Sequence, residues 1–132
     1  MREFKYRCWD KVNNQMFIVE RLYFDKKGNA THVGIDIEAL NDDETFQVVD
    51  IKHVELLEFT GLKDKNGVEV YESDILKNDD EEFAVVYDNE DACFTLQDDN
   101  VITNFQVENP AWYEVVGNIY QEEYKHLRGD KQ

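Results

Sequence analysis

Hydrophobic and polar positions alternate along this chain in short runs that are typical of β-strands. Phe4, Tyr6 and Cys8 alternate with Lys5, Arg7 and Trp9, which predicts a strand with one inward face. The segment 31–37 repeats the pattern. Further extended segments are predicted at residues 16–24, 46–51, 54–59, 83–87, 93–96, 101–107 and 112–120. None of them has the length or the 3.6-residue period of a long helix.

Turn-forming residues separate these runs at intervals of about 8 to 12 residues. Asn66-Gly67 stands between two alternating runs and predicts a tight hairpin, because Asn and Gly tolerate positive φ angles. Segment 72–74 predicts a bend or bulge. The pattern as a whole favours a mainly all-β fold of short antiparallel strands, either a barrel or a sandwich, with a short fraying helix in residues 121–132.

A length of 132 residues predicts one domain, 1–132, with a core of its own. A seam near residues 57–61 would separate an N-terminal sheet, 1–57, from a C-terminal barrel, 58–120, although composition does not mark it. Hydrophobic residues make up 42% of the chain and there is a single proline, which argues against disorder.

The net charge of the chain limits the classes of partner that it can bind. Thirty Asp and Glu face fourteen Lys and Arg, a formal net charge of -16 that repels nucleic-acid phosphates. We therefore expect no direct nucleic-acid binding. The same charge keeps a small protein soluble and would suit a basic partner, and we weigh solubility above a dedicated electrostatic role.

The two cysteines, Cys8 and Cys93, lie in strand-like segments and do not suggest a disulfide framework. The first residues lack the apolar stretch of a signal peptide, and no later run approaches the roughly 18 apolar residues of a membrane helix. We expect a cytoplasmic protein, without membrane contact and with both thiols reduced.

No cofactor or metal motif is recognisable. In a calcium-binding loop with Gly67 at the sixth place, Leu62 would be first and Ser73 twelfth, where carboxylates are required. The three histidines lack zinc-ligand spacing, and no phosphate-binding glycine loop or serine elbow occurs. The acidic clusters at 42–44, 79–82, 88–91 and 98–99 fall at predicted turns, where Asp is locally favoured. We expect no enzyme, no cofactor and no metal.

Three segments, near the start, the middle and the end of the chain, carry a family resemblance. The positions that matter, called the motif positions below, are Arg7, Trp9, Asp10, Thr60, Gly61, Asp64, Asn66, Gly67, Tyr71, Asp74, Gly117 and Asn118. In this order and context they resemble the YopX family of small phage and prophage proteins, over essentially the whole chain. The resemblance implies an SH3-like small barrel in the C-terminal part and transfers no catalytic residues.

The chain departs from the family pattern at Glu58, where Gln is usual, and at Ser73, where Gly is usual. If position 73 needs a positive φ angle, Ser costs on the order of 1 kcal/mol there relative to Gly. The alternatives are a relaxed turn in this chain or a conformation that was never required.

Three functions are open from the sequence. The first is a non-enzymatic phage- or prophage-encoded protein that acts through protein contacts, with homo-oligomers as one form; an exposed apolar patch with Trp9, Tyr71 or Trp112 would support it. The second is an acidic DNA mimic that inhibits a host nucleic-acid-binding protein. The third is an enzyme with Arg7, Asp10 and Asp74 in a pocket.

Overall fold

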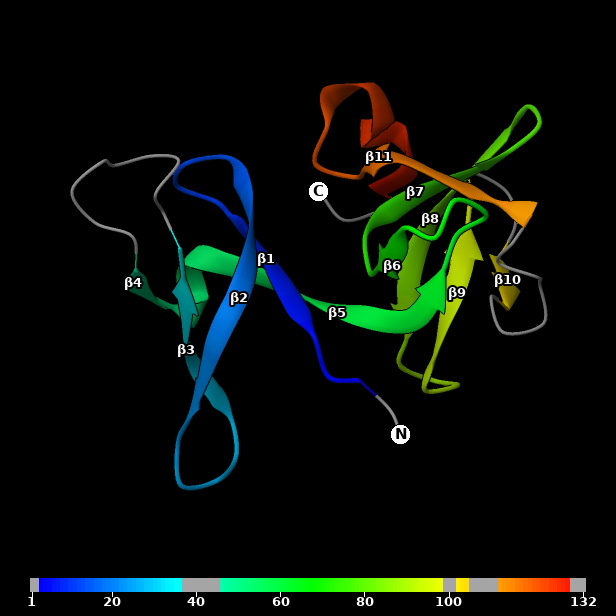
Figure 1. Cartoon of the computed structure of the whole chain (residues 1–132). Helices are drawn as coiled ribbons and strands as arrows, with labels where there is room; N and C mark the ends of the chain where they lie inside the picture. Colours follow the sequence, from blue (N-terminus) through cyan, green and yellow to red (C-terminus); the bar gives the residue numbers. More distant parts are fainter. Residues whose placement is uncertain (1–2, 37–45, 99–101, 105–111, 129–132) are drawn as a thin grey trace. The chain divides into compact units, whose positions relative to one another are not determined.

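The computed structural model describes residues 3–36, 46–98, 102–104 and 112–128, and these are mostly antiparallel β-strands (Figure 1). The all-β prediction is confirmed. The chain divides into two compact units, which we call the N-terminal unit, Glu3–Glu58, and the C-terminal unit, Phe59–Gln132. None of the helices in the described residues is long and apolar enough to cross a membrane.

The N-terminal unit is a twisted antiparallel sheet in the strand order β4-β3-β2-β1-β5. Its elements are β1 (Tyr6–Asp10), β2 (Gln15–Phe24), β3 (Ala30–Ile35), β4 (Gln47–Asp50), the 3-10 helix η1 (Ile51–His53) and the first half of β5 (Val54–Lys63). One face of the sheet forms the core, made of Cys8, Phe17, Val33, Ile35 and Val54. The predicted strand start at Phe4 is wrong, because β1 begins at Tyr6 and Phe4 is 69% exposed.

The C-terminal unit contains a five-stranded antiparallel sheet in the order β10-β9-β8-β7-β11. Its elements are the second half of β5, then β6 (Glu69–Tyr71), β7 (Asp74–Asn78), β8 (Glu81–Asp88), β9 (Cys93–Gln97), β10 (Ile102–Asn104), β11 (Glu114–Asn118) and the 3-10 helix η3 (Glu122–Arg128). Of the segment predicted at 101–107, residues 101 and 105–107 lie outside the described residues, as does the acidic cluster at 42–44. The SH3-like barrel stays a prediction.

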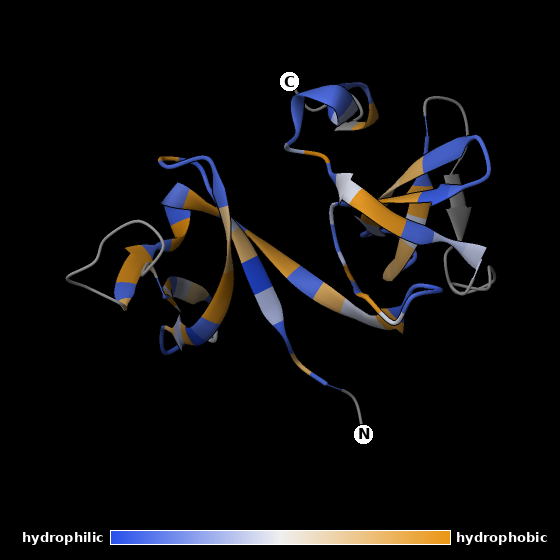
Figure 2. Cartoon of the chain, turned by 45° about the horizontal axis from the view of Figure 1, so that its top comes forward, coloured by the Kyte–Doolittle hydropathy of each residue, from blue (hydrophilic) through white to orange (hydrophobic). Residues whose placement is uncertain are grey.

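Both faces of the five-stranded sheet are covered, which explains the near-continuous hydrophobic runs in β7 and β8. Leu76 pairs with Phe83, and both belong to the larger core cluster. Ile75 pairs with Ala84 on the opposite face, where Leu127 of η3 packs against them. In the N-terminal unit, whose sheet has its core on one face, hydrophobic and hydrophilic residues instead alternate along the strands (Figure 2).

Strand β5 passes from one unit into the other without a loop. Its residues 54–58 pair with β1, whereas Phe59 and Lys63 pair with β6. The register shifts between Phe59 and Lys63, and Gly61 within this shift has φ +88°. The second half of β5 therefore carries a bulge that depends on glycine.

Candidate functional site

The motif positions include all the buried aspartates in the described part of the chain. Asp10, Asp64 and Asp74 have exposed fractions of 4%, 6% and 2%. Buried carboxylates are costly unless hydrogen-bonded, so the partners of each one show what the motif does.

Asp10 closes the hairpin turn between β1 and β2. Its Oδ1 accepts hydrogen bonds from the backbone N–H of Val12 at 2.8 Å and of Asn13 at 3.1 Å, and its Oδ2 accepts one from Asn13 Nδ2 at 2.8 Å. The backbone carbonyl of Asp10 accepts from the N–H of Asn14, which has φ +54°. Asp10 is therefore a turn cap.

Asp64 performs the same task in the predicted hairpin between β5 and β6, which the structure confirms. Its Oδ1 accepts from the N–H of Asn66 at 2.8 Å and of Val68 at 2.9 Å. The Gly67 N–H donates to the Asp64 carbonyl at 3.0 Å, and Gly67 has φ +82°. This is a type I turn followed by a left-handed glycine, in which Asn66 does not need a positive φ.

The second oxygen of Asp64 reaches across the unit to β11. Asp64 Oδ2 accepts a hydrogen bond from the N–H of Val115 at 2.9 Å, and the N–H of Lys65 donates to the carbonyl of Tyr113 at 3.0 Å. Asn66 Nδ2 adds a long contact of 3.4 Å to Glu114 Oε2. Strand β11 lies at the edge of its sheet. The turn at residues 64–68 supplies hydrogen-bond partners for backbone groups at the start of this strand.

These donors also control the charge of Asp64. Burial alone would raise the pKa of the carboxyl, but the backbone donors of Val115, Val68 and Asn66 outweigh it and hold the pKa below its ordinary value of 3.8. Asp64 is consequently ionised at neutral pH, as an acceptor of three N–H groups should be.

Thr60 and Gly61 shape the bulge that precedes this turn. Thr60 Oγ1 donates to the carbonyl of Val70 at 2.7 Å and accepts from the N–H of Leu62 at 3.2 Å. The hydroxyl thus replaces ladder hydrogen bonds that the bulge disrupts.

Tyr71 and Asp74 form the corner at which the chain leaves β6 and enters β7. Asp74 Oδ2 accepts from the N–H of Tyr71 at 2.8 Å, and the Tyr71 ring lies 5.5 Å from the ring of Phe59 between centroids. Tyr71 is buried, with an exposed fraction of 6%, so it packs in the core and does not contribute to a surface patch.

Ser73 stands inside this corner and has φ +77°. Its N–H donates to the carbonyl of Val85 at 2.8 Å, and its carbonyl accepts from the N–H of Ile119 at 3.0 Å. The conformation is therefore required, and the alternative of a relaxed turn is wrong. The Ser73 hydroxyl is buried and has no hydrogen-bond partner among the described residues.

Gly117 and Asn118 lead from β11 into η3. Asn118 Oδ1 accepts from the N–H of Tyr120 at 3.0 Å, while Gln121 Oε1 accepts from the N–H of Asn118 at 2.8 Å. A Cβ on Gly117 would lie 2.6 Å from Tyr124 Cε2, which is too close. The side chains of Asn118 and Gln121 thus supply acceptors for the backbone N–H groups of the turn between β11 and η3.

Arg7 and Trp9 are half-buried on β1 and lie on the face opposite Cys8. In the register of β1 and β2, Arg7 faces Ile18 and Trp9 faces Met16, so the four side chains share one face of the sheet. Ile18 is 62% exposed there. Trp112 is also exposed, at 57%, and belongs to the C-terminal unit.

The thiol of Cys8 is unreactive as a nucleophile at neutral pH. Burial, assisted by the charge of Asp10, raises the pKa of the Cys8 thiol to about 11, so the thiol is protonated at neutral pH. Cys93 is free and half-buried. Within the described ranges no group of three or more His, Cys, Asp or Glu side chains is arranged to hold a metal ion.

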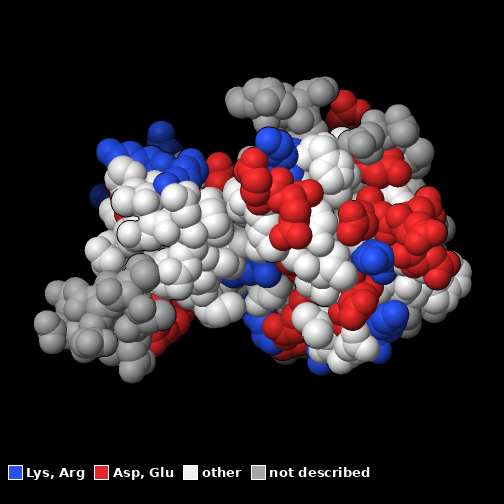
Figure 3. Space-filling view, turned by 90° about the horizontal axis from the view of Figure 1, so that it is seen from above, with Lys and Arg blue, Asp and Glu red and all other residues white. Residues whose placement is uncertain are grey.

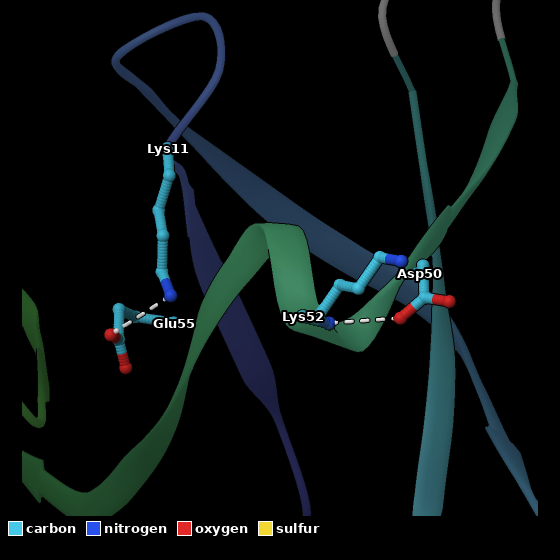
Figure 4. A network of polar contacts seen from close by, with 4 residues as sticks. All are labelled: Lys11, Asp50, Lys52 and Glu55. Atoms are coloured by element: carbon cyan, nitrogen blue, oxygen red, sulfur yellow. Dashed lines mark hydrogen bonds and ion pairs between the residues drawn. The ribbon is translucent and has the colours of Figure 1, made fainter.

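A small polar network lies at the rim of the N-terminal unit (Figure 4). Asp50 Oδ1 accepts from the N–H of Lys52 at 3.0 Å and caps η1, and this bond is the main reason that the pKa of Asp50 lies below its usual value. Lys11 Nζ lies 3.4 Å from Glu55 Oε1. Both contacts are exposed and contribute little to stability.

Charge is divided unevenly between the units. Residues 59–132 contain eighteen Asp and Glu and six Lys and Arg, a net charge of -12, whereas residues 3–58 contain twelve and seven, a net charge of -5. Carboxylates gather on the face of the C-terminal unit that Figure 3 presents. Acidity is thus mainly a property of the C-terminal unit.

Comparison with known proteins points to one family. The family model described as YopX protein matches residues 5–124. No curated protein matches the chain. The chain is similar to the crystal structure of protein EF1440 from Enterococcus faecalis, with a TM-score of 0.66 and 22% sequence identity over 96% of this chain and 99% of that chain. At this identity the likeness shows the fold alone.

Proposed function

The chain belongs to the YopX protein family, and we propose that it is a phage- or prophage-encoded cytoplasmic protein that acts through protein–protein contacts and not as an enzyme. The buried motif aspartates support this reading, because their oxygens accept backbone hydrogen bonds in turns. The oxygens of Asp64 in particular are occupied by Asn66, Val68 and Val115. What remains available to a partner is the surface that these turns position.

The observation that carries the proposal is the face of β1 and β2 that lies opposite the core of the N-terminal unit. Trp9 and Met16 are half-buried side by side, and Ile18 is 62% exposed next to them. Aromatic and Met side chains that keep part of their area exposed, with an Arg beside them, are typical of interface centres. We therefore assign the protein contact to this face.

Ile18→Glu tests the assignment. Tagged wild-type protein and the variant are used to capture partners from a lysate of the natural host, and each captured protein is then measured for direct binding. Val12→Glu is the matched control, because Val12 is 68% exposed in the neighbouring turn and gains the same charge. We expect I18E to lose the partner and V12E to keep it; equal binding by both would remove this face from the proposal.

A second candidate, an acidic inhibitor that mimics DNA, is favoured by the net charge of -12 on residues 59–132. Its partner would be a host nucleic-acid-binding protein with a basic groove. Such a partner should be retained at low salt, released at high salt and displaced by duplex DNA. A salt-resistant partner that DNA does not displace would contradict mimicry and favour the apolar face.

A further inference from the structure

The turn between β2 and β3 presents a basic and aromatic surface on an acidic protein. Residues 24–29, here called the hairpin tip, are held by four backbone and side-chain hydrogen bonds. The Asp25 N–H donates to the Asn29 carbonyl at 2.9 Å and the Gly28 N–H to the Asp25 carbonyl at 3.1 Å. Asp25 Oδ1 accepts from the N–H groups of Lys27 at 2.8 Å and Asn29 at 3.0 Å. The tip is therefore a preorganised surface.

The outward side chains of the hairpin tip are those of Phe24, Lys26 and Lys27. Phe24 is 58% exposed and belongs to none of the hydrophobic clusters of the described residues. Lys26 and Lys27 are exposed, and neither forms an ion pair within the described part of the chain. An exposed aromatic ring and two ammonium groups in one turn, without an ion pair among the described residues, fit a partner that offers carboxylates around an apolar contact.

A surface of the required charge exists on the same chain. The turn between β7 and β8 exposes Asp79, Asp80 and Glu81, and η3 exposes Glu122 and Glu123. Both segments belong to the C-terminal unit, in which η3 packs on the sheet that contains β7 and β8. The carboxylates of this unit gather on a shared face (Figure 3).

We propose that the hairpin tip docks onto the acidic face of the C-terminal unit of a second copy of this chain. The contact is heterologous, because two different surfaces meet, so each copy has one tip and one acidic face to offer. The net charge of -16 on every copy opposes the approach, which makes the association weak and concentration-dependent. Salt screens both this repulsion and the local attraction, so salt dependence alone does not identify the contact.

Reciprocal charge reversal identifies it at constant salt. One full-length variant carries K26E and K27E, and another carries D80K and E81K. The weight-average mass of each protein is measured by sedimentation over a range of concentrations. We expect wild-type mass to rise with concentration and each variant alone to associate at least about tenfold more weakly. An equimolar mixture of the two variants should regain association, because the reversed tip of one then meets the reversed face of the other, and the unchanged tip meets the unchanged face.

The control E90K/D91K changes the charge equally in the turn between β8 and β9 and should associate like wild type. Thermal unfolding of every variant verifies that it is folded. A wild type that stays monomeric at all concentrations would overturn the proposal, and so would variants whose mixture is no more associated than either alone. Association lost equally in E90K/D91K would indicate overall charge instead of this face, and would overturn it as well.

Discussion

The protein contains the same turn twice, once in each unit, and uses it differently. Both turns begin with Asp-Lys and place Gly fourth, at Gly28 with φ +87° and Gly67 with φ +82°. In both, the first Asp accepts two N–H groups through Oδ1 and the glycine N–H donates to the Asp carbonyl. Asp25 is exposed, however, whereas Asp64 is buried and also accepts from Val115, 51 residues away.

The comparison shows that the local sequence determines the conformation of the turn, whereas contacts with distant residues determine what the turn stabilises. At residues 25–29 the turn joins β2 to β3, and its lysines form no ion pair with the residues that the structure describes. At 64–68 it fastens the start of β11 and thereby joins two motif segments that are far apart in the sequence. Four changes would break or sharpen this comparison.

The largest effect is expected for Asp64→Asn. In one orientation of the new amide, its nitrogen would face the N–H of Val115. In the other orientation it would face the N–H groups of Asn66 and Val68. Either way, a buried N–H group loses its acceptor. We expect the free energy of unfolding to fall by about 2–3 kcal/mol. Urea unfolding followed by fluorescence measures it. Asp25→Asn is the matched control in the exposed turn and should cost clearly less; similar losses would mean that the Val115 bond contributes little.

Ser73→Gly should stabilise the protein. Ser73 has φ +77° and a buried hydroxyl without a partner among the described residues, and glycine removes both costs. The gain is about 1–2 kcal/mol after the greater freedom of glycine in the unfolded chain is subtracted. Ser73→Ala removes the hydroxyl but retains the strain, so it should gain less. A loss of stability in S73G would show that the hydroxyl has a partner that stabilises it.

Replacing the two turn glycines by alanine should cost nearly the same amount. Gly28 and Gly67 both have positive φ, and a Cβ would meet nothing within 4 Å at either position. Only the backbone conformation is penalised, by about 1 kcal/mol in each case. Paired urea unfolding curves of G28A and G67A check this. A much larger loss for G67A would show that the hydrogen bonds from this turn to β11 depend on the glycine as well as on Asp64.

The smallest effect is expected for the dependence of stability on pH. The pKa of Asp64 in the folded protein is below its ordinary value, so its contribution to stability is present above about pH 4 and is lost as the pH falls through the folded pKa. Wild type should therefore lose more stability than D64N between about pH 5 and pH 2. Unfolding free energies at several pH values measure the difference. Equal slopes for the two proteins would contradict an ionised, hydrogen-bonded Asp64.

Local signals in the sequence predicted local structure well. Asn66-Gly67 predicted a hairpin that the structure confirms, and the extended segment predicted at 16–24 is β2, Gln15–Phe24. Phe4 was assigned to a strand because it continued an alternation, but alternation does not show where pairing stops, and β1 begins only at Tyr6. A short helix was predicted from residue 121, and η3 begins at Glu122.

Long-range partners were beyond sequence reasoning. Nothing near Asp64 indicates that Val115 would complete its hydrogen bonds, since the two residues are 51 positions apart and β6 to β10 lie between them in the sequence. The role of Asp10 was left open between a turn cap and a member of a pocket, and the structure places its oxygens on Val12 and Asn13. The φ angle of Ser73 could be stated only as a condition, because it follows from contacts with Val85 and Ile119.

The central claim is that the Asp64 carboxylate holds the start of β11, and amide hydrogen exchange at Val115 tests it most directly. Exchange is followed by NMR in wild type, D64N and the control D25N at neutral pH. We predict a protected Val115 N–H in wild type and D25N, and loss of that protection in D64N while the amides of β8 stay protected. A Val115 amide that exchanges rapidly in wild type, or one equally protected in D64N, would contradict the account.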